Sequence, residues 1–138
     1  MRIALIADTP IAPLRRPLAA ALSQLGITPK FTVLEDISED FEQSAARLDD
    51  AEPDLAIISF NAWQLVPEIF CAEVLLGPVE RRRELVEAAA QKLLHRVRLV
   101  RTACSGTLLV NDLAIPTASP LGIQDTAVEL GLAASIRR

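Results

Sequence analysis

Four short apolar segments, separated by stretches with helical spacing, constrain the fold of this chain more than any other feature. The segments lie at 2–7, 31–34, 55–60 and 106–111. The first is an almost continuous apolar run, which is typical of a strand buried on both faces of a parallel sheet. Strands that alternate with helices predict an α/β fold in which right-handed crossovers connect the strands.

The segments between the first three strands predict two helices. Apolar residues recur at helical spacing from Leu14 to Leu25, and Gly26 stands where a helix commonly ends. A second helix is expected to begin near Ser38, because acidic residues follow this candidate N-cap. Its apolar side is predicted to consist of Phe41, Ala45 and Leu48.

The longest predicted helix begins after Gly77-Pro78 and continues to about Ala103. Its apolar stripe is predicted to contain Val86, Ala90, Leu93, Val97 and Val100, with the arginines on other faces. We read 61–77 as a loop with one short helix, 114–125 as a loop and 127–136 as a last helix. A single domain is therefore predicted over 1–138, as a three-layer α/β/α fold with a parallel sheet of four to five strands.

Charge is unevenly distributed although the net charge is only −4. Nine acidic residues lie between Glu35 and Asp54, and seven basic residues lie between Arg81 and Arg101. The basic stretch, which begins with Arg81, Arg82 and Arg83, is a candidate surface for an acidic partner; a solvated helix face is the alternative. The net acidic charge, without interleaved aromatic residues or glycines, argues against a nucleic-acid partner.

Several other classes of protein are not indicated. No apolar run approaches the roughly 20 residues of a membrane helix, and the first apolar run is too short for a signal peptide. We therefore predict a cytoplasmic protein without a membrane partner. Cys71 and Cys104 are expected to be buried, reduced thiols. Because His95 is the one histidine, no metal site is predicted, and no cofactor is indicated.

The carboxyl ends of parallel strands are where ligands gather in such folds. That rule selects Asp8, Thr9, Ser59, Asn61, Asn111 and Asp112. The turn after the first strand has no glycine, so a phosphate-binding loop of the nucleotide-binding kinds is excluded. Trp63 is a candidate binding residue, with simple packing as the alternative.

No complete nucleophile, base and orienting acid can be assembled from the sequence. His95 lies inside the long arginine-rich helix and is predicted to be an ordinary residue of a helix face. Cys104 precedes a strand instead of following one, and we expect it to be structural.

Two strand-end motifs resemble those of the SGNH hydrolases. Ala7-Asp8-Thr9 stands where that superfamily has Gly-Asp-Ser, and Ser59-Phe60-Asn61 stands where it has Gly-x-Asn. The resemblance implies an SGNH-hydrolase or flavodoxin-like fold, with Thr9 at the nucleophile position and Asn61 at that of the oxyanion donor. Threonine replaces serine, both glycines are gone and the late Asp-x-x-His pair is absent. The resemblance therefore implies the fold more than the activity.

Over nearly its whole length the chain resembles the N-terminal SGNH-like domain of FkbH-like proteins. The similar segments are IALIADTPIAPLRRPLAAAL, PDLAIISFNAWQLV and LLVNDLAIPTASPLGIQD. In polyketide pathways this domain precedes a HAD-type domain, which dephosphorylates a glycerate phosphate and loads glyceryl onto an acyl carrier protein. The aspartate motif of the HAD-type domain is not in these residues.

Three functions are compatible with these features. The first is a non-catalytic binding or scaffold module of polyketide biosynthesis, which recognises an acyl carrier protein or a HAD-type partner domain. The second is a weak esterase or acyltransferase that uses Thr9, assisted by Asp8 or by a histidine that a partner supplies. The third is a small-molecule sensor, and a homo-oligomer is left open in each case. Apolar side chains between Trp63 and Leu76 are expected to face a partner.

Overall fold

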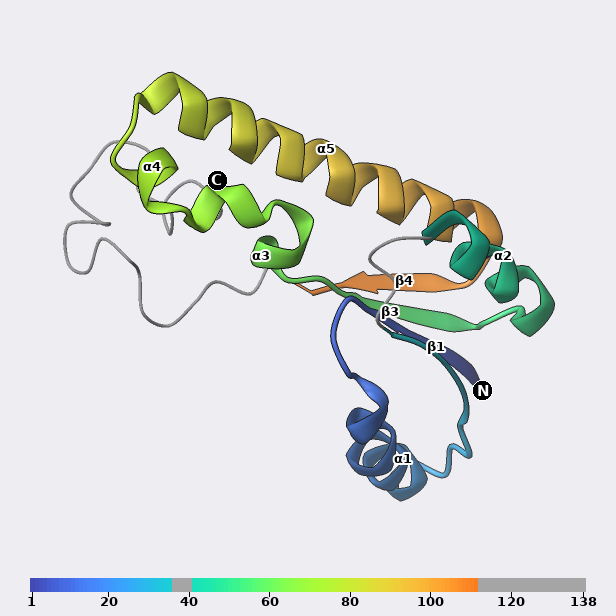
Figure 1. Ribbon diagram of the computed structural model, residues 1–138. Coiled ribbons are helices and arrows are strands. Elements are labelled where there is room, and N and C mark those ends of the chain that lie inside the picture. Colours follow the sequence, from blue (N-terminus) through green and yellow to red (C-terminus); the bar gives the residue numbers. More distant parts are fainter. Residues whose placement is uncertain (36–40, 112–138) are drawn as a thin grey trace. The chain divides into compact units, whose positions relative to one another are not determined.

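The computed structural model describes residues 1–35 and 41–111, in which strands and helices alternate (Figure 1). The elements are, in chain order, β1 (Arg2–Ala7), the 3-10 helix η1 (Ala12–Leu14), α1 (Arg15–Gln24), β2 (Lys30–Leu34), α2 (Phe41–Ala51), β3 (Leu55–Ser59), α3 (Ala62–Leu65), the 3-10 helix η2 (Pro67–Phe70), α4 (Ala72–Leu75), α5 (Val79–Ala103) and β4 (Thr107–Val110).

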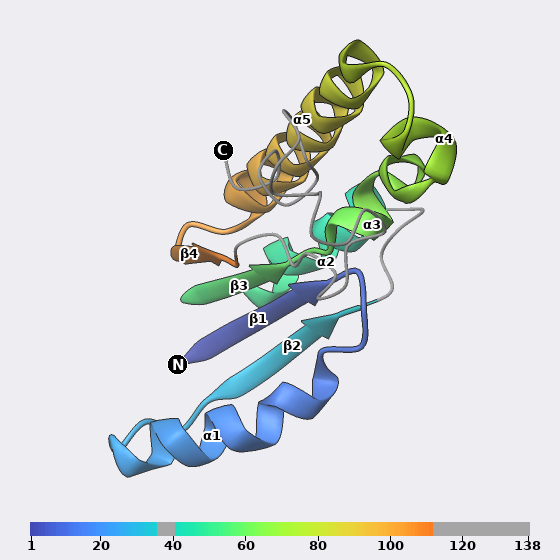
Figure 2. The same ribbon diagram turned by 90° about the vertical axis from the view of Figure 1, so that its left-hand side faces the viewer.

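The four strands form one parallel sheet in the order β2-β1-β3-β4 (Figure 2). Ile3 of β1 is paired with Phe31 on one side and with Leu55 on the other, and Leu55 is paired with Thr107 of β4. The predicted α/β fold with a parallel sheet is confirmed. A fifth strand and three complete layers stay predictions.

The described residues form two compact units. One comprises 1–60 and 95–111 and contains the whole sheet, α1, α2 and the end of α5. The other comprises 61–94 and contains α3, η2, α4 and most of α5. That residues 1–138 form a single domain stays a prediction.

Strand β1 is buried on both faces, as its apolar composition predicts, whereas β3 is buried on one face and partly buried on the other. On one face Ile3, Leu5 and Ala7 of β1 form a cluster with Ile11, and Leu18 and Leu22 of α1 pack against it. Side chains that point to the opposite face are also buried: Ala4, Ile6, Ala56 and Ile58. Such burial removes most of the apolar surface of these strands from water, which stabilises the fold.

Gly26 ends α1 as predicted. It adopts a left-handed backbone with φ +73°, which is readily accessible to glycine alone among the residues. Its N–H donates to Ser23 O, and the N–H of Ile27 donates to Leu22 O, both at 3.0 Å. These two bonds are those of a Schellman motif, which satisfies carbonyl groups at the end of a helix.

The long helix α5 has the predicted bounds within a residue, but its buried face differs from the prediction. Leu85, Ala89 and Val100 are buried, whereas Ala90 is exposed. The prediction that the arginines occupy other faces is wrong for Arg82, which is 7% exposed, and for Arg96, which is partly buried. Arginine has a long aliphatic stem that packs well against apolar surface, so it can occupy such a stripe.

Segment 61–77 contains three short helical turns, α3, η2 and α4, instead of a loop with one short helix. The helix that begins near Phe41 is confirmed, with Phe41, Ala45 and Leu48 buried. Its predicted start at Ser38 lies outside the described residues. So do Asp112, the loop predicted at 114–125 and the helix predicted at 127–136.

Asp54 connects the starts of β1, β3 and β4. Its Oδ2 accepts the N–H of Arg2 at 2.6 Å, and its backbone N–H donates to Arg2 O at 2.9 Å. Its carbonyl oxygen accepts the N–H of Thr107 at 2.9 Å. The bond from the Arg2 backbone N–H lowers the pKa of Asp54, and the positive charge of Arg2 adds to this shift, while partial desolvation opposes it.

This arrangement predicts how stability depends on pH. Because the pKa of Asp54 is lower in the folded protein, its contribution is fully present above the unfolded value of about 3.9 and is lost as the pH falls through the folded value. Replacing Asp54 by asparagine keeps an acceptor but removes the charge. We expect Asp54→Asn to lower the midpoint of urea unfolding at pH 7, and the difference from wild type to shrink steadily toward pH 3. A difference that does not depend on pH would contradict this account.

Candidate functional site

Residues from three strands lie at the carboxyl-terminal edge of the sheet. Asp8 follows β1, Ser59 ends β3 and Asn111 follows β4. The Nδ2 group of Asn111 donates to Ser59 Oγ at 3.4 Å, and its backbone N–H donates to Ile58 O at 2.7 Å. The structure thus brings together two of the residues that the sequence selected. This contact places a hydroxyl and an amide side by side at the strand ends.

Asp8 is a buried acid, with 3% of its surface exposed. A buried carboxylate is costly unless an opposite charge or hydrogen bonds compensate it. The negative charge of Asp8 acts on Arg96, which lies in the part of α5 that belongs to the same unit. Burial lowers the pKa of Arg96 below its ordinary value, and the charge of Asp8 opposes that shift.

Two phenylalanine rings hold the guanidinium of Arg96. Its Cζ atom lies 5.4 Å from the ring centroid of Phe41 and 5.0 Å from that of Phe60. The two rings meet edge to face, with centroids 5.8 Å apart. Cations over aromatic faces are attracted by the ring quadrupole, and this attraction is stronger where water is excluded. The result is a positioned cation near a buried acid at the strand ends.

Sequence reasoning missed Arg96 because it assigned every arginine of α5 to a solvated face. A signal was present: Arg96 lies seven residues after Ala89 and four before Val100, so helical spacing places it on the buried face. Phe41 and Phe60 were recognised only as apolar residues. Their role as the support of a cation depends on contacts between distant parts of the chain.

The loop between β1 and α1 is fixed by an acid from the end of the neighbouring strand. Glu35 follows β2, and its Oε2 accepts the N–H groups of Ile11 at 2.8 Å and Ala12 at 3.0 Å. A phosphate group in this loop would need such amides as donors. These amides are already bonded to a carboxylate. This agrees with the exclusion of a phosphate-binding loop, which the absence of glycine from this turn had indicated.

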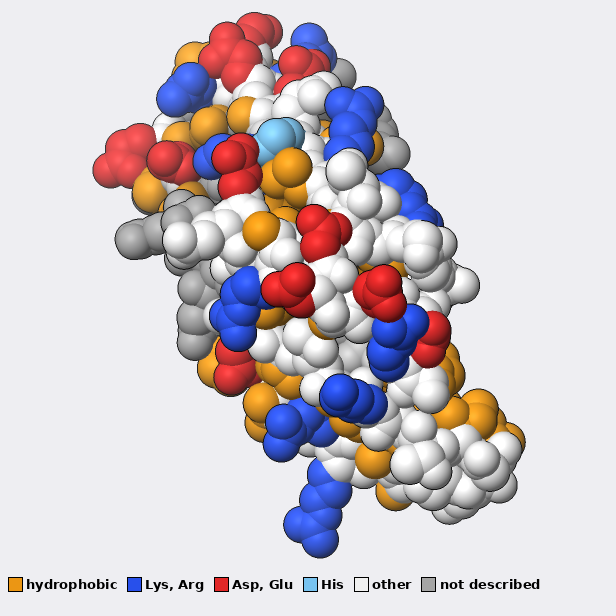
Figure 3. Space-filling model, turned by 90° about the vertical axis from the view of Figure 1, so that its right-hand side faces the viewer, with side chains coloured by type: hydrophobic (Ala, Val, Ile, Leu, Met, Phe, Trp, Pro, Cys, Tyr) orange, Lys and Arg blue, Asp and Glu red, His pale blue; other side chains and the backbone are white. Residues whose placement is uncertain are grey.

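His95 lies on the exposed side of α5, as predicted for an ordinary helix-face histidine. Its side chain is 63% exposed, and its Nε2 is 3.8 Å from Glu42 Oε1 of α2 (Figure 3). A hydroxyl nucleophile needs a base within hydrogen-bonding reach, and that base is most often histidine. The one histidine of the chain is therefore associated with a surface carboxylate.

Thr9, which is partly buried, belongs to the unit that contains the sheet, whereas Asn61 and Trp63 belong to the unit that contains 61–94. The carbonyl oxygen of Asn61 accepts the N–H groups of Gln64 at 3.1 Å and Leu65 at 3.2 Å, which begins α3. Trp63 is 37% exposed. The roles suggested for Thr9 as the nucleophile, for Asn61 as the oxyanion-hole donor and for Trp63 as a binding residue stay predictions.

The three arginines at the start of α5 have different surroundings. Arg81 is exposed and forms an ion pair with Glu84 at 3.1 Å, and Arg83 is exposed. Arg82 is buried, and its Nη1 donates to Gly77 O at 3.4 Å. This bond connects α5 to the turn that precedes it. Of the three, Arg81 and Arg83 are thus the two that are exposed to solvent.

The two cysteines also differ. Cys104 is buried, and its Sγ donates to Pro53 O at 3.4 Å, as expected for a structural thiol. Cys71 is exposed, so the prediction that it is buried is wrong; it follows the short helix η2 at the surface. Within residues 1–35 and 41–111, acids, cysteines and the histidine do not gather into a group that could hold a metal ion.

Comparisons with family models, with curated proteins and with solved structures found no match to this chain. Among the helices in the described part of the chain, none has the length and apolar character needed to cross a membrane. The resemblance to FkbH-like proteins and the cytoplasmic location both stay predictions.

Proposed function

We propose that this chain is a non-catalytic, SGNH-like binding module of polyketide biosynthesis, which recognises an acyl carrier protein or a HAD-type partner domain. The observation that carries the proposal lies at the start of α5. Leu76 is 79% exposed, and Arg81 and Arg83 are exposed in the first turns of the helix that follows it. Arginine is enriched in protein interfaces, whose buried centre is apolar, so these exposed residues support a binding role.

The chemistry of the partner follows from the charge of this surface. Acyl carrier proteins are acidic and carry a phosphorylated pantetheine arm, so both the protein and its arm would be attracted by Arg81 and Arg83. Charge complementarity of this kind raises the rate of association and sets orientation, and salt weakens it. The resemblance of three longer segments to the N-terminal domain of FkbH-like proteins supports a place for the chain in this pathway.

The state of the strand-end residues supports a non-catalytic role. Thr9 replaces serine, and His95 is associated with Glu42 at the surface. Asp8 is buried and interacts with the charge of Arg96, which favours a structural role for this acid. Hydrolysis of a nitrophenyl ester that disappears in Thr9→Ala would contradict the non-catalytic part of the proposal.

The binding part is tested by titrating a phosphopantetheinylated acyl carrier protein against the wild type and against Arg81→Glu/Arg83→Glu. We expect the affinity to fall about tenfold at low salt, with a smaller difference at high salt, because exposed charges are screened there. Arg47→Glu/Arg98→Glu is the matched control: it changes the net charge equally, at two exposed positions elsewhere. Equal losses of affinity in both double variants would show that only the net charge matters. That result would contradict the proposal that Arg81 and Arg83 form the binding surface.

A further inference from the structure

The two exposed arginines at the start of α5 differ in what already faces their charge. The Nη1 group of Arg81 lies 3.1 Å from Oε2 of Glu84, one turn further along the helix. Arg83 is exposed as well, yet among the residues that the structure describes it takes part in no ion pair. The charge of Arg81 is therefore already paired within the helix, whereas that of Arg83 is open to a partner.

The position of Arg81 in α5 explains its ion pair. Arg81 is the third residue of the helix, and cations are unfavourable in the first turn because the N-terminal end of the helix dipole is positive. A carboxylate three positions later lies close enough to offset this cost. Both side chains are largely exposed, 58% for Arg81 and 65% for Glu84, so the pair is weak. A competing acid from outside can displace such a pair.

Arg81 and Arg83 lie on different sides of the helix. Buried Arg82 stands between them in the sequence, and each residue of an α-helix is rotated by about 100° from the one before it. The two exposed arginines therefore flank the buried side of α5. Different acidic groups of a partner contact them, so their contributions to binding can differ.

The charges around the two arginines are mixed. Glu80, Glu84 and Glu87 are exposed in the same turns of α5. All three repel an acidic partner at short range, because salt screens exposed charges beyond about 8–10 Å. Glu84 differs from the other two, because it also pairs with a guanidinium that the partner would use. Within the described part of the chain, Glu80 and Glu87 take part in no ion pair.

We propose that Glu84 is an internal competitor at this surface: its carboxylate takes the place on Arg81 that an acidic side chain of the partner would take, so that Arg83 makes the stronger contact. The inference rests on the proposed function, because it assumes an acidic carrier protein as the partner. Binding at Arg81 exchanges one ion pair for another, whereas binding at Arg83 breaks none. Glu84 thus lowers the affinity of the surface without removing either arginine.

The first test compares Arg81→Gln with Arg83→Gln in calorimetric titrations with an acyl carrier protein at low salt. We expect Arg83→Gln to weaken binding about threefold and Arg81→Gln by less than about twofold, because an exposed ion pair contributes little and that of Arg81 must first be broken. Equal losses of affinity in the two variants, or a larger loss in Arg81→Gln, would overturn the proposal.

The second test removes the competing carboxylate. We expect Glu84→Gln to raise the affinity about twofold at low salt, which is the size of effect that a weak helix ion pair has. Glu87→Gln is the matched control, because it removes one negative charge from an exposed position of the same helix without breaking an ion pair. Its gain should be smaller. Equal gains would show that only the net charge matters and would overturn the proposal.

A double-mutant cycle connects this gain to Arg81. In the Arg81→Gln background, Glu84→Gln should raise the affinity no more than Glu87→Gln does, because no guanidinium is left to release. A full gain in that background would overturn the proposal. The cycle is repeated with a carrier protein that lacks its pantetheine arm, and we expect the same result. If the gain required the arm, its phosphate and not a carboxylate would compete with Glu84, which would also overturn the proposal.

These outcomes can be distinguished from a failure of the proposed function. If the wild type bound no carrier protein, or if Arg81→Glu/Arg83→Glu bound it as tightly as the wild type, the partner surface would be wrong and this inference would fail with it. If binding required the two arginines but Glu84→Gln and Glu87→Gln had equal effects, the proposed function would stand and only the competition would be overturned.

Discussion

Replacing Gly106 by alanine is expected to destabilise the fold by at least about 3 kcal/mol, a large share of the stability of a small domain. A Cβ atom at this position would lie 2.3 Å from Asp54 O, 2.5 Å from Asp54 C and 2.5 Å from Pro53 O. All three are backbone atoms of the turn that begins β3, so no flexible side chain can move aside.

The surroundings of Gly106 explain why the backbone cannot yield cheaply. Thr107 N–H donates to Asp54 O, and the side chain of Arg101 donates to the carbonyl oxygens of Cys104 and Gly106. A shift large enough to admit a methyl group would break the first β3–β4 contact. The measurement is urea unfolding followed by circular dichroism.

Gly26→Ala is the matched control for Gly106→Ala. A Cβ atom at Gly26 would meet nothing within 4 Å, but the residue has φ +73°. Only the left-handed conformation is penalised there, which costs about 1 kcal/mol. If the two substitutions lowered the stability equally, the close approach at Gly106 would not be the cause.

The second large effect is expected at Arg96. Arg96→Met keeps an aliphatic stem between Phe41 and Phe60 but removes the charge that acts on Asp8. Removing one partner of a buried pair costs about 3–5 kcal/mol, because the other charge stays buried. Since solvent reaches part of Arg96, we expect a smaller loss, about 2–3 kcal/mol, in urea unfolding.

A double-mutant cycle separates the charge from the packing. Asp8→Asn in the Arg96→Met background removes the buried acid that has lost the charge of Arg96, so the double variant should be more stable than the sum of the single losses predicts. Arg98→Met, two residues away and exposed, should change stability by less than about 0.5 kcal/mol. Strict additivity of the Asp8 and Arg96 effects would show that the two residues do not interact.

The parts of the fold that the sequence predicted are those that local patterns determine. The apolar run at β1 indicates a strand buried on both faces, and Gly26 indicates a helix end, because each depends on nearby residues and elementary backbone geometry. The strand-end rule then identified Asp8, Ser59 and Asn111 at one edge. Periodicity placed the long helix correctly within a residue.

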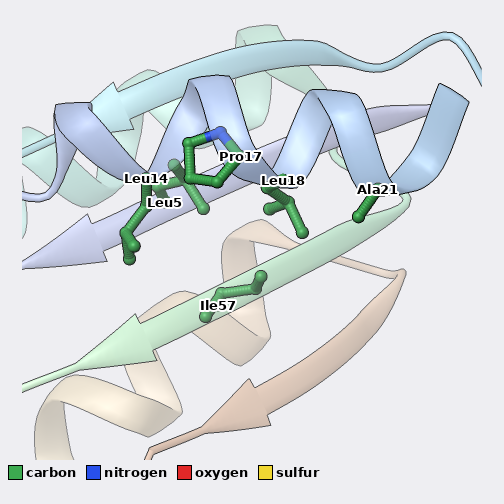
Figure 4. Close-up of a pocket in the computed structure, with 6 residues that line it drawn as sticks. All are labelled: Leu5, Leu14, Pro17, Leu18, Ala21 and Ile57. Atoms are coloured by element: carbon green, nitrogen blue, oxygen red, sulfur yellow. The ribbon is translucent and has the colours of Figure 1, made fainter.

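The features that were missed depend on contacts between distant residues. Glu35 was noted only as one of nine clustered acidic residues, yet it bonds to amides 24 and 23 positions earlier in the chain. Arg82 and Arg96 were assigned to exposed faces because hydropathy treats arginine as polar along its entire length. The open apolar groove between α1 and the sheet, lined by Leu14 and Leu18 of the helical segment and by Ile57 of β3, was also missed (Figure 4). Spacing along a helix does not show how much of a sheet that helix covers.

The sheet order also determines how the chain can assemble. Pairing β1 with β2 joins residues 2 and 30, which are 28 positions apart in the chain. Pairing β1 with β3 joins residues 3 and 55, and pairing β3 with β4 joins residues 55 and 107. Each of these two pairings spans 52 positions. The longer loops cost about 0.5 kcal/mol more entropy to close. During synthesis β1 can therefore meet β2 before β3 exists, while β4 completes the sheet only after the whole of α5 has been made.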